Sequence, residues 1–183
     1  MFEDVGLFTL RAVLGLLIAA HGSQKLFGWF GGYGFAGTAG YMGSVLRLRP
    51  AGLWTATGAV SEFAGGILLA LGLATGVGAA AVAAAMLTAV ALAHWPRLWG
   101  TDNGMEYPLV AGVAAAAVGL IGPGAWSLDA ALGLTALQPG HFLAGLAAGV
   151  LGAGAALVTR IPAAAALPGV EISAEPEQLR PAA

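Results

Sequence analysis

The stretch that decides the fold covers residues 54–95 and reads WTATGAVSEFAGGILLALGLATGVGAAAVAAAMLTAVALAHW. Within it, only Glu62 and His94 titrate in the usual range. About 20 apolar residues of helix cross the roughly 30 Å hydrocarbon core of a bilayer, so the stretch predicts two crossings joined at residues 71–75. A carboxylate in the middle of a crossing costs about 2.5–3.5 kcal/mol on insertion scales. Glu62 must therefore face protein, water or a ligand.

The composition extends this prediction to the whole chain. Of its 183 residues, 58% are apolar and 9% are charged, which is too little charge to cover a soluble globule of this size. We therefore expect an all-α, polytopic membrane protein. The seven Lys and Arg residues are scattered along the chain, which excludes a nucleic-acid binder. The chain has no cysteine, so any thiol or iron–sulfur chemistry must come from another subunit.

Three further segments are apolar enough to enter a membrane, at residues 5–28, 106–121 and 142–158. Residues 29–50 are too polar and glycine-rich to cross, and they predict a short interfacial helix that is either a lid or an anchored connection. The last segment is rich in Pro and Ala and predicts a disordered tail. We expect a four-helix membrane bundle over residues 1–135, an extra hydrophobic helix over 136–159 and a flexible tail over 160–183.

The cations predict the orientation in the membrane. Five crossings place all of them except Arg11 at one face, and the positive-inside rule assigns that face to the cytoplasm. The amino terminus lacks the basic region of a secretory signal, so we expect it to be retained, outside the cytoplasm. The protein is then a multi-pass protein of the inner (plasma) membrane with a cytoplasmic tail. This assignment depends on residues 142–158 crossing the membrane.

Four polar residues on four helices are predicted to share one cavity. Counting 1.5 Å of helix rise per residue, His21 and Glu62 lie at comparable depths, while His94 and Glu106 lie nearer the same surface. We expect the four to line a cavity that opens toward the cytoplasmic side. For Glu106, in the first turn of its helix, a structural role through the helix dipole is the alternative.

Three more charged residues accompany this set. Lys25 lies on the same side of its helix as His21, and we expect it to snorkel to the membrane surface. Arg11 lies toward the opposite face and is predicted to form a buried pair with Asp129 or with Glu62. Such a pair often sets helix orientation without chemistry, so we favour a structural role for Arg11.

The types of these residues limit the cofactor. Two His and two carboxylates suit Zn, Fe or Cu, but they come from four helices without a metal-binding spacing, so a metal is the less favoured interpretation. The histidines also lack the neighbours of a haem site. A quinone fits better, because its ring needs an apolar slot and its oxygens need a His or Lys donor and a carboxylate proton relay.

Five motifs occur in order around the first four hydrophobic segments: RAVLGLLIAAHGSQKLFG, SEFAGGILLALGLATG, AHW, GME and GPGAWSLD. Together they resemble the DoxX family of small bacterial membrane proteins over about residues 10–132. The resemblance implies a four-helix bundle linked to redox metabolism. Relatives include the membrane subunit of a thiosulfate:quinone oxidoreductase and mycobacterial proteins that join a superoxide dismutase to a sulfurtransferase. The resemblance marks six residues as site positions without giving their roles: Arg11, Lys25, Glu62, His94, Glu106 and Asp129.

The leading functional hypothesis is a quinone-linked membrane redox subunit, an oxidoreductase component in which Glu62 and His21 relay protons. Lys25, His94 and Glu106 would shape the mouth of the pocket. The expected partners are the lipid bilayer and a soluble sulfurtransferase or superoxide dismutase, and a homo-oligomer stays open. The alternatives are a non-catalytic scaffold for soluble redox enzymes and a transporter of small solutes or protons.

Overall fold

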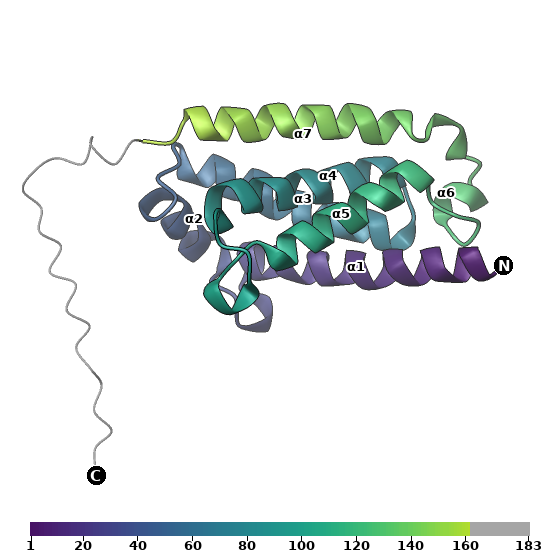
Figure 1. Cartoon of the computed structure of the whole chain (residues 1–183), viewed down its shortest axis with the longest axis horizontal. Helices are drawn as coiled ribbons and strands as arrows, with labels where there is room; N and C mark the ends of the chain where they lie inside the picture. Colours follow the sequence, from purple (N-terminus) through teal and green to yellow (C-terminus); the bar gives the residue numbers. More distant parts are fainter. Residues whose placement is uncertain (162–183) are drawn as a thin grey trace, which may run out of the picture.

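The computed structural model describes residues 1–161, and this part of the chain is a bundle of helices lying along one long axis (Figure 1). This confirms the all-α prediction. The longer helices are α1 (Phe2–Phe27), α2 (Gly34–Ser44), α3 (Ala51–Leu71), α4 (Thr75–Ala89), α5 (Glu106–Ile121) and α7 (Gly140–Val158). The shorter ones are α6 (Leu128–Ala131), the π-helical turn η2 (Val90–His94) that continues α4, and the 3₁₀ turns η1 (Trp29–Gly31), η3 (Gly100–Asp102) and η4 (Thr135–Leu137).

Four of the described segments are long and apolar enough to cross a membrane: α1, α3, α4 with η2, and α7. The protein is therefore a multi-pass membrane protein. Helix α5, which the sequence predicts as a crossing, has 16 residues and spans about 24 Å, short of the roughly 30 Å core. It returns the chain from the end that carries His94 to the end that carries α6 (Figure 1).

Glycines let α1 and α3 approach until their backbones touch. A Cβ added at Gly66 of α3 would lie 2.6 Å from the backbone nitrogen of Ala19 on α1. A Cβ at Gly15 would lie 2.5 Å from the carbonyl oxygen of Gly66, and Gly22 abuts Phe63 in the same way. Small residues give such close contacts in lipid, where no hydrophobic effect drives helices together. The contact fixes residues 15–22 of α1 beside the second half of α3.

Helix α7 packs on α4 as part of the same bundle. Two of its glycines face alanines of α4, with Gly145 against Ala80 and Gly149 against Ala84. Phe142, in its first turn, is 1% exposed and lies against Gly119 of α5. The hydrophobic segment that the sequence separates from the four-helix bundle thus contributes to the bundle's core.

Arg11 holds the carboxyl end of α3. Its guanidinium is 1% exposed and donates to the carbonyl oxygens of Leu69 and Ala70 at 3.2 Å each, and to that of Trp126 at 2.5 Å. The carbonyls in the last turn of a helix lack partners within it, so a buried cation there satisfies them. Arg11 therefore ties the end of α3 to the segment before α6.

Asp129 holds the other side of the same α3–α4 turn. Its carboxylate accepts hydrogen bonds from the backbone nitrogens of Ala74 at 2.7 Å and Thr75 at 2.8 Å, where α4 begins. The prediction that Arg11 pairs directly with Asp129 or with Glu62 is wrong. The side chains of Arg11 and Asp129 each bind backbone groups instead. The structural role that we favour for Arg11 agrees with these contacts.

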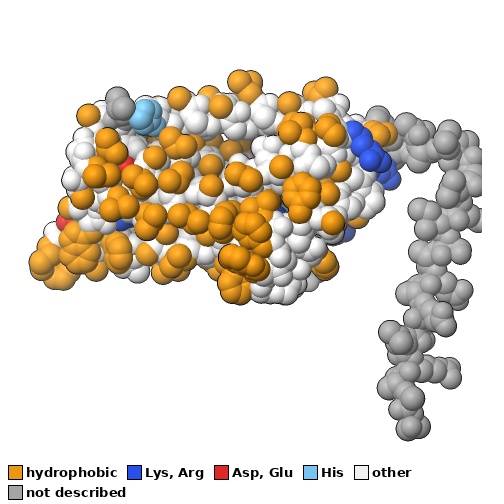
Figure 2. Space-filling model, turned by 180° about the vertical axis from the view of Figure 1, so that it is seen from behind, with side chains coloured by type: hydrophobic (Ala, Val, Ile, Leu, Met, Phe, Trp, Pro, Cys, Tyr) orange, Lys and Arg blue, Asp and Glu red, His pale blue; other side chains and the backbone are white. Residues whose placement is uncertain are grey.

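The cations gather at the end opposite to this turn. The described members of the group are Lys25, Arg47, Arg49, Arg97 and Arg160, and Figure 2 shows Lys and Arg side chains beside the point where the described chain stops. The last described residue, Ile161, donates from its backbone nitrogen to the carbonyl of Arg47 at 3.0 Å. Arg180 and all of the predicted tail after Ile161 lie outside the described residues. The cytoplasmic assignment of this end stays a prediction.

Candidate functional site

A cavity of about 360 Å³ lies at the cation-bearing half of the bundle. Ligand pockets in proteins have volumes of about 300–1,000 Å³, so this one can hold a small molecule. Its walls come from α2, α3, α4 with η2 and α7, while Lys25 enters from α1. The α7 wall consists only of Ala and Gly, and most of the remaining lining is apolar.

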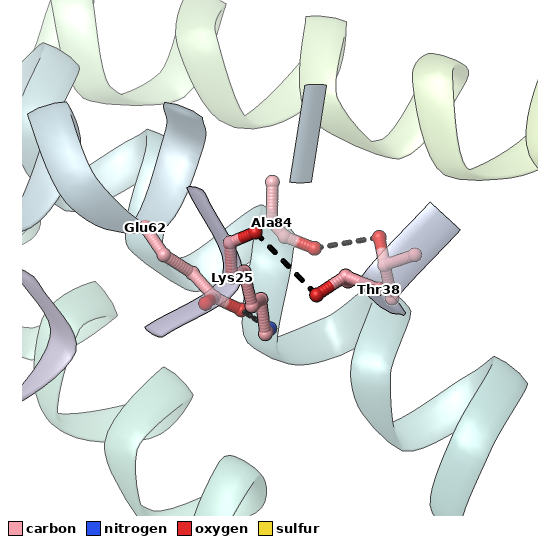
Figure 3. Close-up of polar contacts among 5 residues, drawn as sticks. Lys25, Thr38, Glu62 and Ala84 are labelled. Atoms are coloured by element: carbon pink, nitrogen blue, oxygen red, sulfur yellow. Dashed lines mark hydrogen bonds and ion pairs between the residues drawn. The ribbon is translucent and has the colours of Figure 1, made fainter. Parts of the chain in front are cut away.

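Glu62 is the buried charge of this cavity. It lies on the inward stripe of α3 together with Thr55, Ala59 and Gly66, at the spacing of one helix face, and it is 3% exposed. One carboxylate oxygen, Oε1, accepts a hydrogen bond from the Lys25 ammonium in an ion pair (Figure 3). The expectation that Lys25 only snorkels to the surface is therefore wrong, although a third of its side chain stays exposed. The close contact of α1 with α3 positions this pair.

The second carboxylate oxygen of Glu62, Oε2, is buried and has no hydrogen-bond partner among the described residues. An ionised carboxylate only accepts hydrogen bonds, and a buried acceptor without a donor costs about 1–3 kcal/mol or more. Glu62 is one of the residues that line the cavity, and Oε2 is its acceptor without a partner.

Helix α2 closes one side of the cavity with Thr38, Tyr41 and Met42. Thr38 is buried, and its hydroxyl lies 2.8 Å from the carbonyl oxygen of Gly34. The same hydroxyl lies 3.4 Å from the carbonyl oxygen of Lys25 (Figure 3). The helix predicted within residues 29–50 is thus present as α2, and it packs beside the residues that carry the ion pair, while its interfacial position stays a prediction.

His94 lines the cavity at the end of η2. Its Nδ1 lies 2.8 Å from the carbonyl oxygen of Asn103, and because a carbonyl only accepts, Nδ1 must be the donor. In the neutral ring Nε2 then carries the lone pair, so His94 offers an acceptor. The π-helical turn that positions it is a feature often found at functional sites.

The cavity does not collect all of the predicted site residues. The ring of His21 packs against that of Tyr107 at a centroid distance of 5.2 Å, and the Glu106 carboxylate accepts a hydrogen bond from the backbone of Gly100 at 2.9 Å. Neither His21 nor Glu106 lines the cavity. Arg11 and Asp129 lie at the far turn. In the described part of the chain, no three His, Asp or Glu side chains come together as a metal site would require.

The sequence does not single out several residues of the cavity wall. Gly58 lies four positions before Glu62, so the helical period of α3 already contained a signal for it, whereas Ser61, one position before Glu62, lies about 100° around the helix and had no such signal. No comparable signal marks Trp54, or Gly149 and Gly152 on α7, because their place depends on how distant helices pack.

Comparisons with known proteins identify the chain through its family. No curated protein and no solved structure matches it. A family model described as DoxX matches residues 6–95, from the first turns of α1 to the residue after η2. The matched part contains the ion pair of Lys25 with Glu62 and also His94. Through residues 6–95, the protein belongs to the DoxX family.

Proposed function

We propose that the cavity binds the head group of a membrane quinone, and that the protein is the membrane subunit of a quinone-linked redox system. The observation that carries this proposal is the buried Glu62 carboxylate, with one oxygen unpartnered in an otherwise mostly apolar cavity. Ionisable groups at bilayer depth are costly and mark ligand or proton pathways.

The donor set suits a quinone. A planar ring with two polar oxygens needs apolar walls and a few polar contacts, and this cavity supplies both. Trp54 and Leu92 contribute apolar surface, while Lys25, Glu62 and His94 contribute the polar groups. A bound quinone would supply two-electron, two-proton redox chemistry.

The residues of this chain would then bind the ring and move protons. The Lys25 ammonium holds a proton at Nζ beside Glu62 Oε1, and it is a third exposed, so it reaches both the cavity and the surroundings of the bundle. In this arrangement Lys25 replaces His21 as the partner of Glu62. Glu62 accepts and returns protons inside the cavity, and the Nε2 lone pair of His94 is a second acceptor. The proposed electron donor is a soluble thiol or sulfur compound, and its sulfur is supplied from outside this chain, which has no cysteine.

Binding can be measured on the purified full-length chain in mild detergent. Quinones quench tryptophan fluorescence, and Trp54 lines the cavity. Titration with a short-chain quinone should give saturable quenching that Trp54→Phe reduces and Trp99→Phe, in an exposed loop, retains. Glu62→Gln should weaken binding of the reduced hydroquinone form at least tenfold, while Glu3→Gln, the same change at an exposed site on the far end, should not. The absence of saturable binding, with no quinone extracted from the purified protein, would refute the proposal.

A scaffold that recruits soluble redox enzymes is the second candidate, and the exposed arginines at one end of the bundle favour it. It predicts that Glu62→Gln leaves function intact, while replacing Arg47, Arg49 and Arg97 with alanine abolishes capture of the partner. Proton or solute flux into liposomes that depends on Glu62 would instead favour a transporter.

A further inference from the structure

We infer that the cavity recognises a hydroxyl donor on its ligand, and therefore binds the hydroquinone form more tightly than the quinone form. This inference rests on the proposed quinone site and specifies which redox state the site prefers. It follows from counting the donors and acceptors that the cavity-lining residues carry.

The strongest polar group in the cavity is an acceptor without a donor. Glu62 Oε1 is occupied by Lys25, whereas Oε2 is buried and unbonded. A quinone carbonyl also only accepts, so placing it against Oε2 would bring two acceptors together. A hydroquinone O–H can donate to Oε2, and the hydroquinone oxygen can at the same time accept a hydrogen bond from Lys25.

The threonine hydroxyls that line the cavity offer no free donor to a ligand. Thr38, Thr57 and Thr88 donate to the carbonyl oxygens of their own helices, to Gly34 at 2.8 Å, to Leu53 at 2.9 Å and to Ala84 at 2.7 Å, so only their lone pairs remain. The indole of Trp54 donates to the carbonyl of Arg49 at 3.2 Å.

The Nδ1 proton of His94 is committed to Asn103, so in the neutral ring Nε2 is a further acceptor. The donors left for a ligand are the other N–H groups of Lys25 and the hydroxyls of Ser61 and Tyr41. A hydroquinone oxygen, which both donates and accepts, matches this mixture better than a carbonyl oxygen does.

The preference has a redox consequence. Sites with a buried polar group discriminate strongly against ligands that leave it unpaired, and we expect at least tenfold tighter binding of hydroquinone. For a two-electron couple, each tenfold preference for the reduced form raises the bound midpoint potential by about 30 mV. Reduction of the quinone consumes two electrons from the sulfur donor and two protons from water, so the site would favour electron transfer toward the quinone.

The test compares three probes on the full-length chain, under anaerobic conditions: a short-chain quinone, its hydroquinone and the dimethyl ether of that hydroquinone. Isothermal titration calorimetry should give a hydroquinone Kd at least tenfold below the other two. In Glu62→Gln, whose amide can donate, the ratio between hydroquinone and quinone should fall toward one, and Glu3→Gln should keep it.

Equal affinities of the unmodified chain for quinone and hydroquinone would overturn this inference and leave the quinone site standing. Failure of all three probes to bind would overturn both proposals. Because the probes are compared on the unmodified chain, the test holds even if Glu62→Gln does not fold.

Discussion

Replacing Lys25 with methionine should destabilise the protein by leaving the Glu62 carboxylate buried without its cation. Breaking one side of a buried ion pair costs about 3–5 kcal/mol. Glu62 is 3% exposed, but Lys25 is 33% exposed and its ammonium is partly solvated, which reduces the contribution of the pair. We therefore expect Lys25→Met to lower the free energy of unfolding by about 3 kcal/mol, at the lower end of that range.

A double-mutant cycle separates this penalty from the net contribution of the pair. When both charges are replaced by apolar groups of similar volume, the buried carboxylate is gone, and such replacements are often neutral. Lys25→Met combined with Glu62→Leu should therefore recover most of the loss. The measurement is reversible unfolding in mixed micelles by titration with SDS, followed by far-UV circular dichroism. A cost below about 1 kcal/mol for Lys25→Met alone, or no recovery in the double variant, would refute the reasoning.

Three further outcomes are expected in the same unfolding and binding assays. Arg11→Met should lower the free energy of unfolding by about 3 kcal/mol, because one buried and two partly buried carbonyls lose the guanidinium donor, and an equal stability of the variant would contradict the role of Arg11 described above. Gly66→Val should cost about 3 kcal/mol, because its Cβ meets the backbone of α1, whereas Gly52→Val, whose Cβ meets nothing within 4 Å, should cost much less. Gly152→Leu should weaken quinone binding at least tenfold with little loss of stability, because Gly152 lines the cavity and its Cβ would meet nothing within 4 Å. Gly154→Leu is the matched control on the same helix: it has the same free space outside the cavity and should keep full affinity.

The helices could be predicted from the sequence because lipid imposes a simple rule. A membrane segment must satisfy its backbone hydrogen bonds internally, so long apolar runs become helices whatever surrounds them. The predicted segment at residues 106–121 matches α5, the one at 142–158 lies within two residues of α7 at each end, and the two crossings predicted within residues 54–95 correspond to α3 and to α4 with η2. The same rule required that Glu62 face inward, because a carboxylate is costly in hydrocarbon.

The partner of Glu62 could not be predicted in this way. The helical period puts His21 and Lys25 on one side of α1, about one turn apart, and either could have reached α3. The glycine contacts between α1 and α3 bring Lys25 to Glu62, while His21 packs against Tyr107 of α5. A shift of one turn between two helices changes nothing in the hydrophobic pattern of either helix, yet it exchanges the ionic partner.

The sequence by itself therefore determined that this protein is helical, that it lies in a membrane and that one carboxylate must be kept away from lipid. Only the tertiary structure decided that Lys25 accompanies that carboxylate, that Arg11 and Asp129 bind the backbone of the distant turn, and that α7 completes the cavity wall. The physical reason is that burial and backbone hydrogen bonding are settled within each segment. Side-chain pairing depends instead on the register between segments, and that register follows from where small residues allow two helices to touch.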